Sequence, residues 1–325
     1  MIFRKPITGA VLFCLLSPLL HAQQTMQYSQ FMLNPAAYNT GYTGTEDALS
    51  ASFQYRTQWT GLPGHPVLQE FNVNTPLSWA GWAAGIFVNN ETAGALRNTE
   101  AELALNRLSR AKKFTLGYGL RFGLMQVALD GDKLRAPDGD YSNGQINHND
   151  GFLPVSTVSA LVPDASAGVV LRSKRIQIGL AANHVTGLKA AFKVENNILD
   201  YTLSRSYVAN ASYLFPVGRK LSLRFSGLVK YETPLWQTEW NGLLYYKKLF
   251  WVGLGYRGHD TNSQDAVSGY AGIHLTPELS IGYSYDYTLS ALQTANNGSH
   301  EVLLSYRLSL TRPYKPGKFI FTPRF

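Results

Sequence analysis

Several aspartates gather in one stretch of the sequence, where they could bind a cation: Asp130, Asp132, Asp138, Asp140 and Asp150. Oxygen-rich loops bind Ca²⁺, and an Asp-x-Asp spacing resembles the start of such a loop. No acidic residue closes the pattern at the EF-hand distance, and Asp and Asn in loops are mostly turn formers. A turn-rich loop is therefore favoured, and a Ca²⁺ site in residues 130–163 stays an open alternative.

The triplet Ser299-His300-Glu301 carries residue types used by hydrolases. Neighbouring residues on a strand point to opposite faces, so Ser299 and Glu301 would share one face and His300 the other. The sequence contains no nucleophile elbow, His-Glu-x-x-His pair or phosphate-binding loop. We therefore predict no enzyme activity, no catalytic residue, no cofactor and no metal.

In the segments around these residues, apolar or aromatic residues alternate with small or polar ones, so that the pattern repeats every two residues. In the run from Leu279 to Thr288, Ile281 and three tyrosines alternate with small or polar residues, and the run from Val302 to Leu310 repeats the pattern. Such alternation is typical of strands with one apolar and one polar face. Tyr283, Tyr285, Tyr287 and Tyr306 are expected to face outward.

The same alternation recurs through most of the chain. It predicts fourteen strands, with boundaries uncertain by about two to four residues, near 49–58, 67–77, 81–90, 97–107, 113–128, 164–173, 175–186, 204–215, 219–230, 236–247, 249–258, 265–275, 278–288 and 299–310. Strands of about ten residues match a tilted membrane crossing, and an open sheet in lipid would leave backbone groups unpaired. We predict an all-β fold: a transmembrane antiparallel β-barrel over residues 49–310, with strand fourteen closing on strand one.

The polar faces of these strands carry isolated charges among Gly and Ser: Arg121, Arg224, Arg257, Asp286 and Arg307. Small residues and separated charges suit the interior of a closed barrel. Asp286 and Arg307 share a face of neighbouring strands, which predicts an interior ion pair. If the lumen is open instead, these arginines would favour anions, and the protein would be an outer-membrane channel for small solutes.

The composition and the first residues indicate export. Of 325 residues, 15% are charged and 13% are aromatic, and the formal net charge is +8. Residues 1–22 have the basic start, apolar core and small final residue of a secretory signal peptide, which also contains the single cysteine, Cys14. The remaining basic residues are scattered singly, which gives no indication of nucleic-acid binding. We expect an outer-membrane protein in contact with lipid, with both termini in the periplasm because the strand count is even.

Three segments outside the strand cores are candidate partner surfaces. Residues 23–48 form an N-terminal segment expected to be periplasmic and docked. The loop from Tyr55 to Pro66 has two glycines and two prolines that give it a fixed shape, and it presents Trp59. Residues 311–325 form a periplasmic tail whose apolar side chains favour docking: Tyr314, Phe319, Phe321 and Phe325.

Several stretches, taken in order, resemble the PorP/SprF family of outer-membrane proteins from the type IX secretion and gliding machinery of Bacteroidetes. They are QFMLNPA at 30–36, residues 55–66, GIFVNNETAG at 85–94, residues 163–184, residues 215–231, LFWVGLGYR at 249–257, residues 281–308 and the final Pro323-Arg324-Phe325. The resemblance spans essentially the whole mature chain. The chain departs from it at Asn90, where the family often has Asp, and at Thr322, where it often has Cys.

The resemblance implies a non-enzymatic outer-membrane barrel that supports secretion or surface attachment of cargo, often large adhesins bearing a type IX sorting domain. It also implies contact with periplasmic and lipoprotein subunits of the secretion machinery. Strand periodicity by itself supports only an exported barrel.

Overall fold

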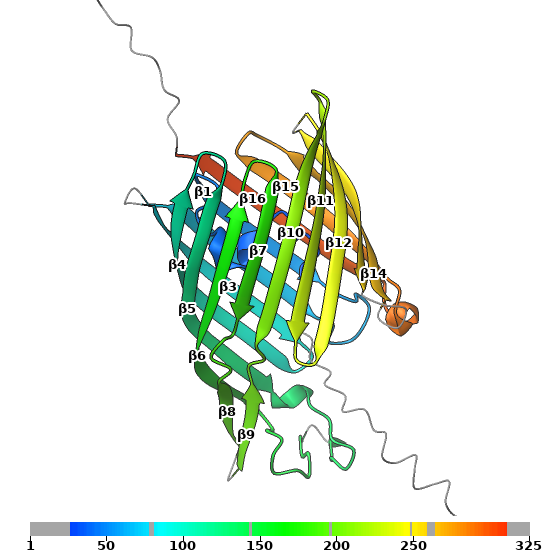
Figure 1. Ribbon diagram of the computed structural model, residues 1–325. Coiled ribbons are helices and arrows are strands. Elements are labelled where there is room, and N and C mark those ends of the chain that lie inside the picture. The colour runs from blue at the N-terminus through cyan, green and yellow to red at the C-terminus, as the bar shows by residue number, and fades with distance from the viewer. Residues whose placement is uncertain are drawn as a thin grey trace, which may run out of the picture.

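The computed structural model describes residues 27–77, 81–142, 145–194, 197–247, 249–258 and 264–310. In this part of the chain, fourteen antiparallel strands close into a barrel (Figure 1). The barrel strands are β1 Ala48–Thr57, β2 Val67–Pro76, β3 Trp82–Ala93, β4 Leu96–Arg110, β5 Thr115–Asp130, β6 Thr157–Arg172, β7 Ile176–Asn183, β10 Ser206–Val217, β11 Leu221–Glu232, β12 Leu235–Tyr246, β13 Phe250–Gly258, β14 Gln264–His274, β15 Leu279–Thr288 and β16 Ser299–Ser309. The predicted fourteen-stranded barrel is confirmed.

The barrel closes where the first and last strands meet. Ala48 is paired with Ser309, and the ladder runs to Thr57 and His300 at its other end. Each remaining barrel strand pairs with its neighbours in sequence, except that β7 pairs directly with β10. Closure leaves no strand edge in the lipid, which a membrane-spanning sheet requires. Among the described residues, no helix is long and apolar enough to cross a membrane.

The outer wall is apolar, as the alternation predicts. Tyr283, Tyr285, Tyr287 and Tyr306 are all exposed, and Leu254 on β13 is 70% exposed. The residues between them, such as Ser284 and Asp286, are buried inside the ring. An apolar wall this extensive is the mark of a barrel whose surroundings are lipid.

The two ends of the barrel differ. Long connections, at 58–66, 131–156, 184–205 and 289–298, all lie at one end, which we call the loop end. The other end holds the short connections at 77–81, 111–114 and 173–175, together with the meeting point of Ala48 and Ser309. We call it the turn end.

Three strands continue past the ring at the loop end. β4, β5 and β6 have 15 or 16 residues each, whereas their neighbour β7 has 8. A separate hairpin of β8 (Lys189–Val194) and β9 (Asn197–Thr202) lies beside this extension (Figure 1). Its Phe192 and Val194 are buried in one cluster with Val127 and Val162.

This region corrects two sequence expectations. Residues 157–163 belong to β6 and not to a loop, because β5 extends to pair with them. Pro163 is tolerated there because, among the described residues, β7 pairs only with residues 167–172, so this stretch of β6 has no ladder to β7 that would need the missing amide. The hairpin β8–β9 lies in residues 187–203, which the sequence indicated as a plain connection.

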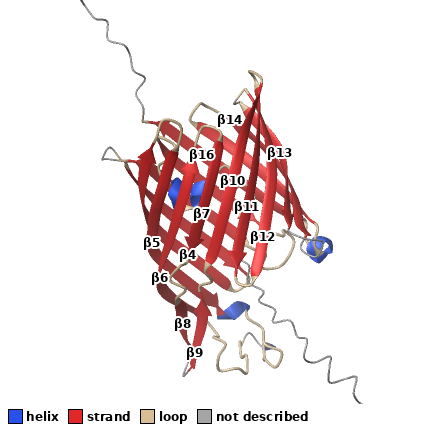
Figure 2. Cartoon of the chain, viewed as in Figure 1, coloured by secondary structure: helices blue, strands red, loops and turns tan. Residues whose placement is uncertain are grey.

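Residues 27–47 lie inside the barrel. Figure 2 shows their short helical turns within the ring of strands, η2 (Pro35–Ala37) and η3 (Thr40–Tyr42). Gln27 contacts Glu239 near the loop end, whereas Asp47 joins β1 at the turn end and accepts a hydrogen bond from Leu310. The segment therefore threads the barrel from one end to the other. Most of its described part is buried in the lumen, and Asp47 at its end is exposed at the turn end.

Candidate functional site

The lumen holds an ordered plug, which we define as residues 27–47. The sequence forms this irregular shape with local capping: Pro35 begins η2, and the side chain of Asn39 accepts a hydrogen bond of 2.8 Å from the Gly41 amide at the start of η3. Ser29, Gln30 and Asn39 are fully buried. A segment without regular structure must find partners for its backbone groups, and the barrel wall provides them.

The first contact is between the plug and Glu301 on β16. The Ser29 amide donates to one oxygen of this carboxylate at 2.7 Å, and the Gln30 amide donates to the other at 2.9 Å. Gln54 on β1 also donates to Glu301, at 2.7 Å. Arg56 adds a fourth hydrogen bond, at 3.4 Å, so this buried carboxylate is well compensated and fixes the backbone of the plug at this point.

The Ser29 hydroxyl is the centre of a buried charge network. It donates to Asp286 at 2.6 Å and accepts from Arg56 at 2.8 Å and from Arg257 at 2.7 Å. Arg56 also lies 2.7 Å from Asp286, and Arg257 lies 2.9 Å from Glu239. Three wall strands thus contribute charges that contact the Ser29 hydroxyl, and Glu239 on a fourth strand pairs with one of them. Breaking such a buried pair costs about 3–5 kcal/mol, because the remaining charge stays buried.

Two amide side chains of the plug extend the contacts. Gln27 donates to Glu239 at 3.0 Å. Asn34 donates to Glu70 on β2 at 2.7 Å and to Gln54 at 3.1 Å. Polar wall residues that would line an open pore are thereby occupied by the plug.

Glycines on the inner wall let the plug approach the strands. A Cβ atom at Gly117 would lie 2.2 Å from the Gly41 carbonyl oxygen, and one at Gly168 would lie 2.1 Å from Asn39 Oδ1. Asn39 uses this space to donate to the backbone carbonyls of Val169 and Leu180. The small residues on the polar faces of the strands therefore allow the plug to pack closely against the inner wall.

Apolar contacts complete the seating. Phe31 and Met32 pack with Leu228, Leu243 and Trp251 in one buried cluster. Burial of a Phe or Met side chain contributes about 1.5–3 kcal/mol. The lumen is thus a mixed core, with hydrophobic contacts beside the charge network.

The structure places the predicted lumen charges as follows. Arg257 and Asp286 belong to the Ser29 network. Arg121 pairs with Glu102 at 3.0 Å and donates to the Ala36 carbonyl of the plug at 2.6 Å. Arg224 donates to the Met32 carbonyl at 3.3 Å.

The predicted ion pair between Asp286 and Arg307 is wrong. Asp286 is paired with Ser299 at the loop end of β16, so Arg307 lies near the opposite end of that strand. Arg307 instead lies 2.6 Å from Glu46, which also contacts Arg172 at 3.3 Å. These two arginines hold the last part of the plug at the turn end.

The sequence interpretation missed Arg56, Glu70 and Glu239, and it considered Glu301 only beside Ser299 and His300 and not as a lumen charge. Each stands on the polar face of a strand that the alternation identifies. Their signal was a charged residue next to an apolar or aromatic one in an alternating run, as Arg56 follows Tyr55 and Glu301 precedes Val302.

The loop end is tied together around Trp59. Trp59 has a left-handed backbone (φ 53°), and its amide donates to Ser299 at 3.1 Å. Thr60 exchanges backbone hydrogen bonds with Gly298 and Asn297, and Gly94 donates to Gly64. The loop at 58–66 therefore has a fixed shape. Tyr314, Phe319, Phe321 and Phe325 lie outside the described residues.

The aspartate-rich loop is built from turns. Asp140 Oδ1 accepts from the amide and hydroxyl of Ser142, at 2.9 and 2.7 Å, and these bonds lower the pKa of that carboxyl. Asp150 accepts from the Phe152 amide in the same way. Within the described ranges, the group of residues with metal-ligand spacing contains none of these aspartates.

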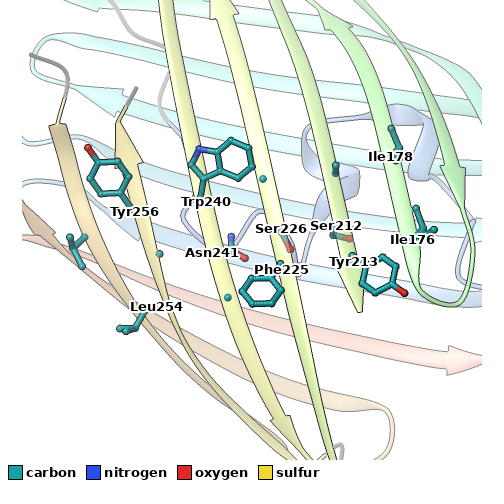
Figure 3. Close-up of a pocket in the computed structure, with 15 residues that line it drawn as sticks. Ile176, Ile178, Ser212, Tyr213, Phe225, Ser226, Trp240, Asn241, Leu254 and Tyr256 are labelled. Atoms are coloured by element: carbon teal, nitrogen blue, oxygen red, sulfur yellow. The ribbon is translucent and has the colours of Figure 1, made fainter. Parts of the chain in front are cut away.

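The outer wall has an apolar hollow of about 690 Å³ over β7 and β10 to β14 (Figure 3). Phe225, Trp240 and Leu254 line its sides. Gly227 and Gly242 lie at its base, where the absence of a side chain makes the hollow deeper. Gly227 is paired with Trp240, and Gly242 with Phe225, so each glycine stands beside a large side chain. The hollow is part of the apolar outer wall and faces away from the lumen.

The family is decided by one comparison. The model of the type IX secretion system membrane protein PorP/SprF family matches residues 20–306. This chain belongs to the PorP/SprF family. The resemblance found in the sequence is confirmed, and the protein is an outer-membrane β-barrel with a link to type IX secretion. No curated protein matches this PorP/SprF chain.

Solved structures similar to this PorP/SprF protein are outer-membrane barrels. The toluene transporter TodX of Pseudomonas putida aligns with a TM-score of 0.50 and 10% identity, over 85% of this chain and 93% of that one. The monoaromatic hydrocarbon channel CymD aligns with a TM-score of 0.48 and 12% identity, over 88% and 94%. The toluene transporter TbuX of Ralstonia pickettii gives 0.44 and 10%, over 80% and 87%. At this identity the likeness concerns the fold alone.

Proposed function

We propose that this PorP/SprF protein is a plugged, non-enzymatic component of type IX secretion that supports secretion or surface attachment of cargo proteins such as adhesins. The observation that carries the proposal is the plug of residues 27–47, held by the charge network around Ser29. A barrel whose polar wall is already occupied is suited to presenting surfaces and poorly suited to free diffusion.

The space left in the lumen supports this reading. Among the described residues, the cavities beside the plug include three of about 130, 110 and 30 Å³. Small-molecule sites usually measure at least about 300 Å³. A small-solute channel would require the plug to leave, and departure would expose the charges of Arg56, Arg257 and Asp286 at once.

The proposed partner surfaces lie at the two ends. At the loop end, the fixed loop around Trp59 and the hairpin β8–β9 would contact cargo that carries a sorting domain. At the turn end, the tail of residues 311–325, with Tyr314, Phe319, Phe321 and Phe325, would contact periplasmic and lipoprotein subunits of the secretion machinery. Rigid surfaces bind with less loss of conformational entropy than mobile ones.

The test is a gene deletion with complementation. The deletion should abolish surface display of a cargo bearing a type IX sorting domain and leave small-solute uptake unchanged. The wild-type gene should restore display, and Trp59→Ala or a chain ending at Leu310 should restore it only in part. Normal display in the deletion strain would overturn the proposal.

Planar-bilayer recording separates the proposal from the channel alternative. The purified protein should show no steady conductance. Steady currents from the wild-type protein would favour an open channel and would count against a plugged component.

A further inference from the structure

A second cluster of ionisable residues lies on the inner wall, away from the Ser29 network. It consists of Glu100 on β4, Asp164 on β6 and His184, the residue that follows β7. His184 Nδ1 lies 2.6 Å from Asp164 Oδ2 and 3.9 Å from Glu100 Oε1. One ligand atom from each residue lies within 4.8 Å of the others. Three strands of the wall therefore bring together one imidazole and two carboxylates.

Glu100 is the unusual member of the cluster. Its residue is 6% exposed, and within the described part of the chain its Oε1 atom has no hydrogen-bond partner. The other oxygen, Oε2, accepts a long bond of 3.4 Å from Asn89. A buried carboxylate oxygen without a hydrogen bond is costly, and a bound cation would offset that cost.

Neighbouring cations are already engaged. Arg121 is bound to Glu102 and to the Ala36 carbonyl of the plug, and Lys230 lies 3.2 Å from Glu232. The negative charge of Glu100 and Asp164 is therefore opposed within the cluster by His184 alone. A divalent cation would balance it.

The cluster borders an internal space. The cavity of about 130 Å³ beside the plug is lined by Glu100, His184 and Ser166 among others. It leaves room for a bound ion and for an exchangeable fourth ligand.

The ligands are oriented by their neighbours. The Thr186 hydroxyl donates to Asp164 Oδ1 at 3.0 Å, so the Oδ2 atom is the one turned to His184. His184 has a left-handed backbone (φ 52°) in a turn closed by the Gly187 amide. Partners that fix the ligands in this way are a regular part of metal sites.

We propose that Glu100, Asp164 and His184 bind a divalent transition metal, for which Zn²⁺ is the probe. One imidazole nitrogen and two carboxylate oxygens form a three-ligand set that suits Zn²⁺ with an open fourth position. Ca²⁺ and Mg²⁺ prefer oxygen ligands only. Coordination through Nδ1 displaces the hydrogen bond between His184 and Asp164.

The experiment is a titration of the full-length protein, purified in detergent and freed of metal with a chelator. Zn²⁺ alone is added and the heat of binding is measured. One equivalent should bind, and Glu100→Gln or His184→Gln should weaken that binding at least tenfold. His300→Gln on the outer wall and His65→Gln in the loop at 58–66 are the matched controls, and both should bind as the wild type does.

Co²⁺ provides a second readout. Its visible absorption should report one nitrogen and several oxygen ligands in the wild type, and this spectrum should be lost in His184→Gln. The Glu100→Gln variant removes an oxygen with no hydrogen bond, so it should fold even if a His184 variant does not; heat-dependent gel mobility checks this. Absence of binding in the wild type, or equal binding in Glu100→Gln, would overturn the site. Either result leaves the role in secretion untouched.

Discussion

The Ser29 hydroxyl lies 2.6 Å from a carboxylate oxygen of Asp286, although 257 positions separate the two residues. This contact joins the beginning of the described chain to its penultimate strand through the interior of the barrel. The same hydroxyl accepts from Arg56 and Arg257. The contacts that hold the plug in place are therefore the same contacts that compensate the buried charges of the barrel wall.

Glu301→Gln should loosen the plug. The substitution removes the charge that holds the Ser29 and Gln30 amides and faces Arg56 at 3.4 Å. We expect a destabilisation of about 3 kcal/mol, since Arg56 loses one of its two buried carboxylate partners. The measurement is the denaturant midpoint in detergent, together with protease cleavage within residues 27–47.

His300→Gln is the control for that variant. His300 is the neighbour of Glu301 but lies on the outer wall, where it contacts the Tyr283 hydroxyl. The free energy of unfolding of this variant, obtained from its denaturant midpoint, should stay within about 0.5 kcal/mol of the wild-type value. Equal effects of the two substitutions would contradict the assigned role of Glu301.

Gly168→Leu should displace the plug from the wall. A Cβ atom at this position would meet Asn39 Oδ1 at 2.1 Å, so Asn39 must move and lose its bonds to Val169 and Leu180. Overpacking of this kind costs about 1–3 kcal/mol. Planar-bilayer recording should show current that the wild type lacks.

The matched control is Gly269→Leu on β14. No atom lies within 4 Å of a Cβ added at Gly269, so this variant should stay closed. Conductance in both variants, or in neither, would show that the glycines of the inner wall do not seat the plug.

Labelling in intact cells should report the orientation of the barrel. Outer-membrane barrels have short periplasmic turns and longer external loops, which predicts that the loop end faces outward. A membrane-impermeant maleimide should label Thr294→Cys in the loop at 289–298 and leave Lys113→Cys in a short turn unlabelled. Reversed labelling would place the loop end in the periplasm.

An epitope tag joined just ahead of Gln27 should be accessible from the same side as Thr294. Gln27 contacts Glu239 near the loop end, whereas Ser309 lies at the turn end beside Ala48. A tag after Ser309 should therefore be accessible from the opposite side. Accessibility of both tags from one side would contradict threading.

Phe192→Asp should detach the hairpin β8–β9 and leave the barrel folded. Phe192 is 2% exposed in the cluster that joins the hairpin to β5 and β6. Loss of a buried Phe costs at least about 3 kcal/mol. An isolated two-stranded hairpin is only marginally stable, so this loss should exceed the free energy that holds β8–β9 in place. Limited proteolysis should cut within residues 187–203 while the heat-dependent gel shift of the barrel persists. Ile198→Asp, at an exposed position of β9, is the control and should remain resistant.

The barrel could be predicted from the sequence because its signal is local. Alternation such as that of Leu279 to Thr288 identifies a strand and its outward face without knowledge of its neighbours. The β6 extension was missed because Pro163 interrupts a run that only pairing with β5 stabilises. The strands β8 and β9 were missed because runs of six residues carry little periodic signal.

The plug could not be predicted in this way. Its residues follow no period, and what holds them are single contacts, such as Ser29 with Asp286, that depend on the register of strands far away in the chain. The same reason explains the wrong pairing of Asp286 with Arg307. A shared face shows which residues point inward, and only the register shows which of them meet.

The plug also bears on how the barrel assembles. Arg56 and Glu301 stand directly opposite each other across the junction of β1 and β16; Ser29 binds both, and Gln30 binds Glu301. Pairing the first strand with the last closes the longest loop in the chain, which carries the largest entropic cost of any strand pairing here. A segment that binds both strands lowers that barrier when it is in place before closure. The plug is then a template for the final step of folding, and a chain that lacks it would be expected to stall as an open sheet.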